Sequence, residues 1–359
     1  MKMIMRWFPF GDDSVTLEQI KQVPGVSGVA TMMPSIPVGE IWPLETIEKL
    51  RAEISRAGLE MEVIESVNIH EDIKKGLPSR DRYIENYITT INNLAAAGVK
   101  CLCYNFMPVM DWARSELEHP LPDGSTVLSY RHEEVVKLNP MAIAETINGN
   151  AKGYSMPGWE PERLDAMARD IEFYQGMTRD RYWANMKYFL DAVIPAAEKG
   201  GLNMAIHPDD PPWPLFGLPK VITGAENIRT FLSLNPSRAN GLTLCTGSLG
   251  ANVANDIPAV VREFASQGRI HFAHVRNVHH LTDVDFDESA HLSECGDFDM
   301  YEIMLAFYES GFDGYIRPDH GRMIWGEKAR PGYGLYDRAL GAEYLLGLWE
   351  AISKCKKRG

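Results

Sequence analysis

The sequence of 359 residues has few cysteines, a deficit of positive charge and no long uninterrupted run of apolar residues. Its cysteines are odd in number and widely spaced, which disfavours a disulfide framework and is typical of a reducing compartment. The apolar start, MKMIMRWFPFGDD, is broken by Arg6 and closed by Asp12 and Asp13, so it matches neither a signal peptide nor a membrane anchor. We therefore expect a cytoplasmic protein. The cysteines are Cys101, Cys103, Cys245, Cys295 and Cys355.

Lysine and arginine total 36 residues against 49 aspartates and glutamates, which gives a formal net charge of -13. This imbalance argues against non-specific binding to nucleic acid or to an anionic membrane, so an anionic ligand needs a local positive site. A hydrophobic content of 45% is ordinary for a globular protein with a sizeable core and disfavours disorder. No internal repeat, linker or low-complexity tract divides the chain.

Eight short runs with the composition of β-strands alternate with longer amphipathic segments. Several of these segments end in a glycine just before the next strand, as expected for a helix C-terminus. The alternation predicts one α/β domain over residues 1–359, a (β/α)8 TIM barrel, with a doubly wound sheet as the main alternative. The predicted strands cover residues 4–10, 26–32, 60–66, 99–106, 202–208, 241–247, 270–276 and 314–320, and the last helix lies within residues 332–354.

The unit after the fourth predicted strand is oversized. Residues 108–176 are rich in turn signals, and they separate that strand from the next long amphipathic segment. We interpret this stretch as an insertion on the catalytic face of the barrel, acting as a lid or a subunit contact. Its aromatic residues Tyr154 and Trp159 are expected to be exposed and to suit a subunit interface.

The fifth to the eighth predicted strands each end in a side chain that can bind a metal ion. In a TIM barrel the carboxyl ends of the strands line the active site, so these side chains are expected to converge there. Two imidazoles, a thiol and a carboxylate suit a divalent metal, with positions left for substrate or water. Taken singly, each has a structural alternative as a loop cap, a small buried apolar residue or a helix cap. The candidate ligands are His207, Cys245, His274 and Asp319.

The stretch IHFAHVRNVHH, residues 270–280, holds four of the ten histidines. Side chains alternate along a strand, so His274 and Arg276 share one face while His271 points to the other, toward the outer helices. Arg276 lies farther toward the loop, where we expect it to bind an anionic group beside the metal; a salt bridge is the alternative. The pattern assigns no role to His279 and His280.

Other polar residues near strand ends are candidates for proton transfer and for substrate binding. His320 follows Asp319 directly, and Tyr333 lies in a glycine-rich loop before the last helix, so both are candidate acid–base groups. A tyrosine in such a loop is more often structural. The candidates for hydroxyl recognition, which follow the third and fourth predicted strands, are His70, Asn105, Asp111 and Trp112.

Over essentially its whole length the chain resembles the mannonate dehydratases, the sugar-acid dehydratases of hexuronate breakdown. Two departures from the family pattern concern the first loop and fine substrate contacts. The chain has FPFG where a Tyr-Gly-Pro turn often follows the first Arg-Trp, and Asn68 where a proline often stands. The stretches that carry the resemblance are RWF at Arg6, ESVNIHEDIK at Glu65, YNFMPVMDW at Tyr104, AIHPDDPPWPLFGLPK at Ala205, LCTGSLG at Leu244, HVRNV at His274, RPDHGR at Arg317 and PGYG at Pro331.

The resemblance implies a barrel that binds Mn2+, or alternatively Fe2+, and dehydrates D-mannonate to 2-keto-3-deoxygluconate. It implies that the metal is held by the four candidate ligands, that Arg276, His320 and Tyr333 bind substrate and transfer protons, and that the protein is a homodimer. The chemistry of the residues is compatible with this, because a divalent cation and an arginine stabilise the ene-diolate formed when the proton α to a carboxylate is removed. A thiolate ligand by itself favours Zn2+ or Fe2+ over harder ions.

Three alternatives stay open at this point. A metal-dependent sugar isomerase or epimerase on the same fold would be expected to rely more on carboxylate ligands. A zinc hydrolase would use a metal-bound water as its nucleophile. A sugar-acid binding protein without catalytic activity would bind a hexonate and not convert it. Sequence also leaves open which of His320 and Tyr333 removes the proton from C2.

Overall fold

A computed structural model describes residues 1–138, 140–154, 156, 159 and 161–356. Eight strands close into a barrel in the order β1-β12-β9-β8-β7-β4-β3-β2, and every neighbouring pair is parallel. The predicted TIM barrel and all eight of its predicted strands are therefore confirmed. The strands are β1 (Lys2–Arg6), β2 (Val26–Thr31), β3 (Glu60–Glu65), β4 (Cys101–Tyr104), β7 (Asn203–Ile206), β8 (Asn240–Cys245), β9 (Ile270–Val275) and β12 (Tyr315–Pro318).

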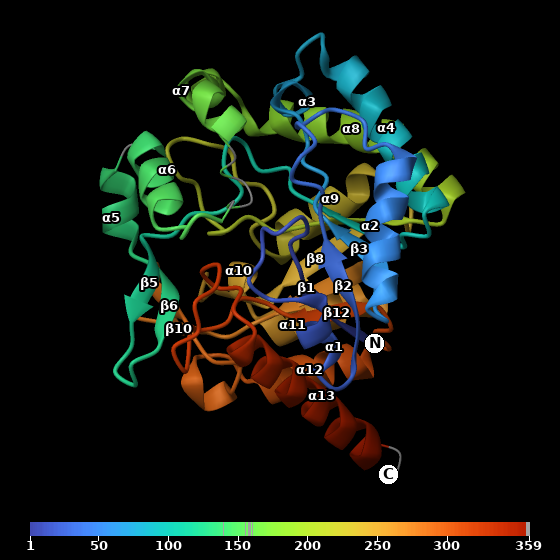
Figure 1. Cartoon of the computed structure of the whole chain (residues 1–359). Coiled ribbons are helices and arrows are strands. Elements are labelled where there is room, and N and C mark those ends of the chain that lie inside the picture. Colours follow the sequence, from blue (N-terminus) through green and yellow to red (C-terminus); the bar gives the residue numbers. More distant parts are fainter. Residues whose placement is uncertain (139, 155, 157–158, 160, 357–359) are drawn as a thin grey trace.

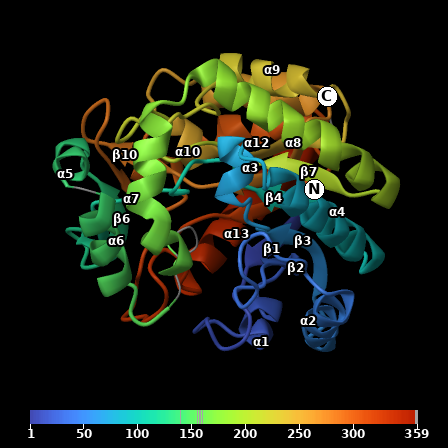
Figure 2. The same ribbon diagram turned by 90° about the horizontal axis from the view of Figure 1, so that it is seen from above.

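Helices surround the barrel when it is seen from above (Figure 2). The predicted glycine ends are present: Gly58, Gly98 and Gly268, which follow three of these helices, have the positive φ that glycine adopts without strain. None of the helices in the described ranges is long and apolar enough to cross a membrane. The outer helices are α1 (Leu17–Lys21), α2 (Leu44–Arg56), α4 (Arg80–Ala96), α8 (Arg179–Gly200), α9 (Ala225–Leu234), α11 (Ile257–Ser266), α12 (Met300–Glu309) and α13 (Tyr336–Lys356).

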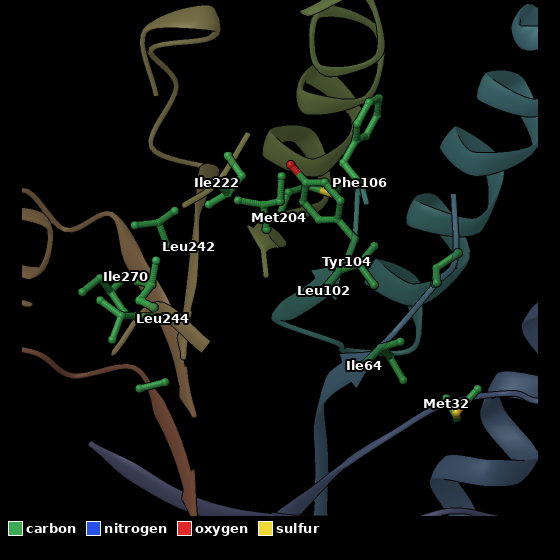
Figure 3. Close-up of a cluster of buried hydrophobic side chains, with 14 of the residues drawn as sticks. Met32, Ile64, Leu102, Tyr104, Phe106, Met204, Ile222, Leu242, Leu244 and Ile270 are labelled. Carbon is green, nitrogen blue, oxygen red and sulfur yellow. The ribbon is translucent and has the colours of Figure 1, made fainter. Parts of the chain in front are cut away.

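Alternation along the strands separates two layers of buried side chains. The residues that fill the barrel interior form one apolar cluster, in which Phe272 is the largest side chain. Its members are Ile4, Ala30, Val63, Cys101, Cys103, Ala205 and Phe272. Residues of the opposite parity pack outward against the helices in a much larger cluster. Figure 3 shows part of that outer layer, including Ile64, Leu102, Tyr104, Met204, Leu242 and Leu244. This apolar layer fills the middle of the barrel and lies below the polar side chains at the mouth.

A second, antiparallel sheet of four strands stands beside the barrel, in the order β10-β11-β6-β5. Two of its strands come from the predicted insertion and two from the loop after β9, so the sheet joins segments far apart in sequence. Figure 1 shows these strands with α5, α6 and α7 on one side of the barrel. The elements are β5 (Glu116–Pro120), β6 (Thr126–Tyr130), α5 (His132–Lys137), α6 (Pro140–Gly149), α7 (Pro161–Gln175), β10 (Val278–His280), β11 (Phe286–Glu288) and the 3-10 turn Ser293–Cys295.

The short helix α3 (Glu71–Lys75) ties the insertion to the barrel. Lys75 Nζ donates to Asp170 Oδ1 at 2.8 Å, and the hydroxyl of Tyr174 donates to Glu71 Oε2 at 2.6 Å. Both partners lie on α7. Hydrogen bonds to charged groups in a buried setting are stronger than neutral ones, so these contacts fix α7 over this side of the barrel.

The expectation of exposed aromatic residues in the insertion is wrong for Trp159. Its side chain is fully buried and packs edge-on against Trp112, with ring centroids 6.3 Å apart. Tyr154 is partly buried, and the guanidinium of Arg330 lies 5.4 Å from its ring. The turn-rich sequence around Trp159 did not predict this burial, because the ring packs against Trp112, which is far away in the sequence.

The close approach of β2 and β3 at Gly28 yields a stability prediction. A Cβ added at Gly28 would lie 2.5 Å from the carbonyl oxygen of Glu60, which is backbone and cannot move aside. We expect Gly28→Ala to lower the free energy of unfolding by about 1–3 kcal/mol, as overpacked sites do.

The matched control is Gly347→Ala in α13, where no atom lies within 4 Å of the added Cβ. This change should raise stability by up to about 1 kcal/mol through helix propensity. Urea denaturation followed by circular dichroism compares the two variants. Equal stability of both variants would contradict the steric account.

Candidate metal centre and active site

A cavity of about 740 Å³ opens at the carboxyl ends of the barrel strands. It is the place where the strand-end argument puts the active site, and it collects most of the predicted site residues. Part of its wall comes from outside the barrel, because Leu128 of β6 and Met156 belong to the predicted insertion. The other lining residues are Arg6, Glu65, Ser66, Cys103, Asn105, Asp111, Trp112, His207, Asp210, Ser248, His274, Arg276, Arg317, Asp319, His320, Pro331 and Tyr333.

Three of the predicted metal ligands converge at the edge of this cavity, and two of them, His207 and His274, line it. One ligand atom of His207, one of His274 and the thiol of Cys245 all lie within 4.8 Å of one another. They stand at the ends of the adjacent strands β7, β8 and β9, which brings them together without any special loop conformation. Such a set of nitrogen and sulfur donors suits a divalent transition metal.

Two of these side chains are held in orientations that suit metal binding. His207 Nδ1 lies 2.7 Å from the carbonyl oxygen of Pro208, an arrangement in which Nδ1–H donates and Nε2 keeps its lone pair. Burial lowers the pKa of His207, which favours the neutral imidazole. Cys245 begins the short helix α10 (Thr246–Gly250), and its sulfur accepts hydrogen bonds from the backbone N–H and the hydroxyl of Ser248 at 3.3 and 3.0 Å.

His274 supplies the clearest sign that the cluster fits a cation. Its Nε2 atom is buried and has no hydrogen-bond partner among the described residues. It lies 3.3 Å from Glu65 Oε2, and the other ring nitrogen lies 3.3 Å from the guanidinium of Arg317. A buried polar nitrogen without a hydrogen bond is costly, and a bound metal ion would satisfy it.

Asp319, the fourth predicted ligand, lies at the edge of this cluster rather than within it. Its Oδ2 atom is 3.4 Å from the Cys245 sulfur and 2.8 Å from Arg276 Nε, and Oδ1 is 2.7 Å from a nitrogen of Arg317. Burial raises the pKa of Asp319, but Arg317, His320 and Arg276 outweigh burial and hold that pKa well below its ordinary value. The carboxylate is therefore ionised and available to a cation.

Arg276 is the centre of a buried ion-pair network. It pairs with Glu288, with Asp210 at 2.9 Å and with Asp319 at 2.8 Å. Arg114 completes the network, because it lies 2.7 Å from both Asp210 and Glu288. Burial lowers the pKa of Arg276, but the surrounding carboxylates outweigh it and raise that pKa well above its ordinary value. The geometry thus favours the salt-bridge alternative for Arg276, although its side chain does line the cavity.

The two predicted acid–base groups form a hydrogen-bonded pair. His320 Nε2 lies 3.1 Å from the hydroxyl of Tyr333, and His320 Nδ1 lies 2.9 Å from both carboxylate oxygens of Glu288. With Nδ1–H donating to Glu288, Nε2 accepts the hydroxyl proton of Tyr333. Burial raises the pKa of Tyr333 to about 12, so the phenol keeps its proton at neutral pH.

The residues predicted to recognise hydroxyl groups divide into two sets. Asn105, Asp111 and Trp112 line the cavity. His70 does not appear among the described residues of its wall; it caps α3, where Nδ1 accepts from the backbone N–H of Asp72 at 3.1 Å. Its ring stacks on Tyr83 with centroids 3.6 Å apart. The structure therefore gives His70 a local structural task in place of the expected position in the site.

The remaining histidines of the stretch 270–280 lie outside the cavity. His271 Nε2 lies 2.9 Å from the carbonyl oxygen of Arg238, so its polar contact is with the loop before β8 rather than with an outer helix. His279 and His280 both lie near Asp297, at 3.5 and 3.1 Å. Only His274 of the four histidines enters the candidate site.

Several charged residues of the site were missed from the sequence. Arg6 and Glu65 end β1 and β3 and line the cavity, so the strand-end rule applied to every strand would have found them. Arg317 pairs with Glu65 through two hydrogen bonds at 2.9 and 3.2 Å. Glu288 lies on the short strand β11 and Asp210 lies in the loop after β7, and neither position gave a signal in the sequence, because the partners of both residues come from elsewhere in the chain.

A model of the protein family described as D-mannonate dehydratase (UxuA) matches residues 1–359. The chain belongs to this family. Relatives named mannonate dehydratase are 56% identical in Thermotoga neapolitana, covering 100% of this chain and 99% of the relative, and 53% identical in Geobacillus thermodenitrificans, covering 100% and 96%. The match covers all the sequence motifs on which the resemblance to the mannonate dehydratases rested.

One solved structure agrees with this family membership, and a second agrees with the fold. A crystal structure of mannonate dehydratase from Streptococcus suis serotype 2 superposes with a TM-score of 0.88 at 45% identity, covering 99% of this chain and 95% of that one. A xylose isomerase domain protein from Planctomyces limnophilus superposes with a TM-score of 0.56 at 13% identity, covering 98% of both chains. The second likeness shows the barrel fold alone.

The network around Glu288 predicts a pH-dependent stability. Burial raises the pKa of Glu288, but Arg276, His320 and Arg114 outweigh it and lower that pKa to about 2. Because the folded-state pKa lies below the unfolded value, the contribution of Glu288 to stability is complete above about pH 4.5 and is lost as the pH falls toward 2. We expect Glu288→Gln to be less stable than the unsubstituted protein by on the order of 3 kcal/mol at pH 7.

This difference should shrink as the pH is lowered, which urea denaturation at a series of pH values measures. The control is Glu343→Gln on the exposed side of α13, which should match the unsubstituted protein throughout. A Glu288→Gln deficit that stays constant from pH 7 to pH 3 would argue against the ion-pair account.

Proposed function

We propose that this protein converts D-mannonate to 2-keto-3-deoxy-D-gluconate with loss of water, as a metal-dependent hydro-lyase in hexuronate catabolism. Family membership over residues 1–359 supports the dehydratase reaction. The single structural observation that carries the proposal is the position of a metal-ligand cluster beside a hydrogen-bonded His320 and Tyr333 pair in one cavity. Dehydration next to a carboxylate needs both of these parts.

His207, Cys245, His274 and Asp319 are the residues that would hold the metal, with Mn2+ as the proposed ion and Fe2+ as the alternative. When bound, a divalent cation stabilises the negative charge that develops on the substrate carboxylate as the C2 proton leaves. The thiol of Cys245 is a soft ligand, so ion availability and not ligand type alone decides occupancy.

We assign the proton transfers from the contacts of His320 and Tyr333. Glu288 holds His320 through Nδ1, which leaves Nε2 to take the proton from C2. Tyr333, whose pKa is about 12, keeps its proton and donates it to the departing C3 hydroxyl. The electron pair released at C2 forms the bond to C3, water leaves, and the resulting enol becomes the 2-keto acid. Both groups must exchange their mutual hydrogen bond for contacts with the substrate.

The rest of the cavity suits a short polyhydroxy acid. Asn105 and Asp111 offer polar groups for hydroxyls, and Trp112 offers a flat apolar wall. Leu128 and Met156 support the proposal that residues 108–176 act as a lid, since this segment already forms part of the cavity wall. We further propose a cytoplasmic homodimer, for which buried Trp159 is not a contact residue.

The alternatives fit the site less well. An isomerase or epimerase that relies on carboxylate ligands would not need the cluster of two histidines and a cysteine found here. A zinc hydrolase needs a metal-bound water as nucleophile, and it gives no task to the paired His320 and Tyr333. A binding protein without activity has no use for a proton-transfer pair inside its cavity.

Removing and restoring the metal tests the reaction. The purified protein is stripped with chelator, Mn2+, Fe2+, Mg2+ or Zn2+ is restored separately, and formation of the 2-keto-3-deoxy acid from D-mannonate is assayed. We expect activity that requires metal and is lost in His207→Ala, because a ligand atom of the cluster is removed. A protein that binds metal but forms no product with any of the four ions would overturn the substrate assignment.

Substitution of the proton-transfer pair tests the roles of its members. We expect His320→Asn and Tyr333→Phe each to lower kcat by about 10² to 10⁴-fold, the usual contribution of a positioned acid or base. The control is His279→Ala, an exposed histidine outside the cavity, which should leave kcat unchanged. In deuterium oxide, a Tyr333→Phe variant that still exchanges the C2 proton of D-mannonate supports His320 as the base; loss of that exchange reverses the assignment.

A further inference from the structure

Three arginines line the cavity, and they differ in how completely their charge is compensated. Arg276 contacts the carboxylates of Glu288, Asp210 and Asp319. Arg317 contacts two carboxylates, those of Glu65 and Asp319, at 2.9 and 2.7 Å. Neither guanidinium needs a further anion to be stable in the protein interior.

Arg6, at the end of β1, is the exception. Its side chain is only 2% exposed, yet in the part of the chain that the structure describes it pairs with one carboxylate, that of Glu65, whose Oε1 atom lies 3.9 Å from Arg6 Nε. That carboxylate is already bound by two nitrogens of Arg317. Within the described ranges the side chain of Arg6 makes one hydrogen bond, to the carbonyl oxygen of Ala30 at 3.3 Å. Most of its five N–H donors therefore have no protein acceptor.

The surroundings of Arg6 add positive charge and little negative charge. Its guanidinium lies 4.3 Å from the centre of the Phe8 ring, and Arg330 lies over the same ring at 3.6 Å. Burial lowers the pKa of Arg6; Glu65 and Tyr333 raise that pKa, and the charges of Arg317 and Arg330 lower it further, so that it stays below its ordinary value. The pKa values of Arg276 and Arg317 are instead raised. A buried cation with so little compensation is costly unless a ligand supplies the anion.

We propose that Arg6 is the residue that binds the carboxylate of the substrate, while Arg276 holds Glu288 and Asp319 in place. This inference rests on the proposed function, since it assumes that the ligand is a sugar acid. A planar guanidinium with free donors matches a carboxylate through two parallel hydrogen bonds.

The position of Arg6 suits the reaction. Glu65, its neighbour, lies 3.3 Å from Nε2 of His274, so Arg6 stands on the same side of the cavity as the metal cluster. Phe8, which packs under Arg6, also contacts the ring of Tyr333 at 5.1 Å. Through these two neighbours Arg6 lies near both the metal cluster and Tyr333, which is the region where C2 and C3 of a sugar acid would have to react.

The test compares an anion with its neutral counterpart. D-gluconate, the C2 epimer of D-mannonate, and D-glucitol, which carries an alcohol in place of the carboxylate, are titrated into metal-restored protein by calorimetry. We expect Arg6→Gln to weaken D-gluconate binding about 10- to 100-fold, the range for a hydrogen bond to a charged group. D-glucitol binding should stay within about twofold, and Arg6→Lys should restore part of the preference for the anion because it keeps the charge.

A stability measurement separates binding from a structural role. Arg6→Gln removes a poorly compensated cation, so its melting temperature without ligand should equal or exceed that of the unsubstituted protein. Arg276→Gln is the matched comparison and should melt at a lower temperature, because it breaks three ion pairs. A lower melting temperature for Arg6→Gln together with unchanged selectivity between the two ligands would assign Arg6 a structural role and overturn the inference.

The binding results are independent of turnover. If Arg6→Gln keeps the preference for D-gluconate, the inference is wrong even if D-mannonate is dehydrated normally. If the unsubstituted protein prefers D-gluconate through Arg6 but forms no product from D-mannonate, the proposed reaction fails while the anion site stands.

Discussion

The active-site end of this barrel depends on the mutual compensation of buried charges. Four arginines and four carboxylates meet at the mouth, and nearly all of them are out of contact with bulk water: Arg6, Arg114, Arg276, Arg317, Glu65, Asp210, Glu288 and Asp319. Removing one member of such a pair leaves an uncompensated charge in a medium where it is poorly solvated. The network therefore holds each side chain at a defined position before any ligand arrives.

The second sheet contributes one of these buried charges. Glu288 lies on β11, which pairs with β6 of the insertion and not with a barrel strand. From there it reaches Arg276, Arg114 and His320 together. The insertion thus does more than supply Leu128 and Met156 to the cavity wall. By pairing with β11 it also holds Glu288, the carboxylate that orients the proposed base His320.

Charge balance also relates the metal cluster to the ligand. The arginines and carboxylates of the mouth cancel one another, so a divalent cation bound by one thiolate would leave one positive charge in excess. A monoanionic sugar acid supplies the missing negative charge. The under-compensated position of Arg6 indicates where that charge is received, and the strongly acidic net charge of the whole chain makes such a local positive site necessary.

Much of the fold and part of the candidate site could be predicted from the sequence, because they follow from the period of the apolar residues or from the position of a residue at the end of a strand. Alternation of strands and amphipathic segments determined the barrel, while the strand ends and the loop before the last helix indicated three residues of the candidate metal cluster and the pair of His320 and Tyr333. The same reasoning misplaced His70, whose ring caps and stacks locally. Sequence reasoning also could not distinguish between ligand binding and a salt bridge for Arg276. A position on a strand predicts the direction of a side chain, but it does not predict which residues contact that side chain.

The sequence by itself therefore determined the fold and the side chains that stand at the ends of several barrel strands, since both follow from local periodicity or from the rule that parallel strands present their carboxyl ends together. Only the tertiary structure decided which charges pair. Arg276 meets Asp210, 66 positions away, and Arg317 meets Glu65, 252 positions away. Such pairings depend on strand order and loop packing, which local sequence does not encode, and among the three arginines of the cavity wall they leave Arg6 with the fewest protein acceptors.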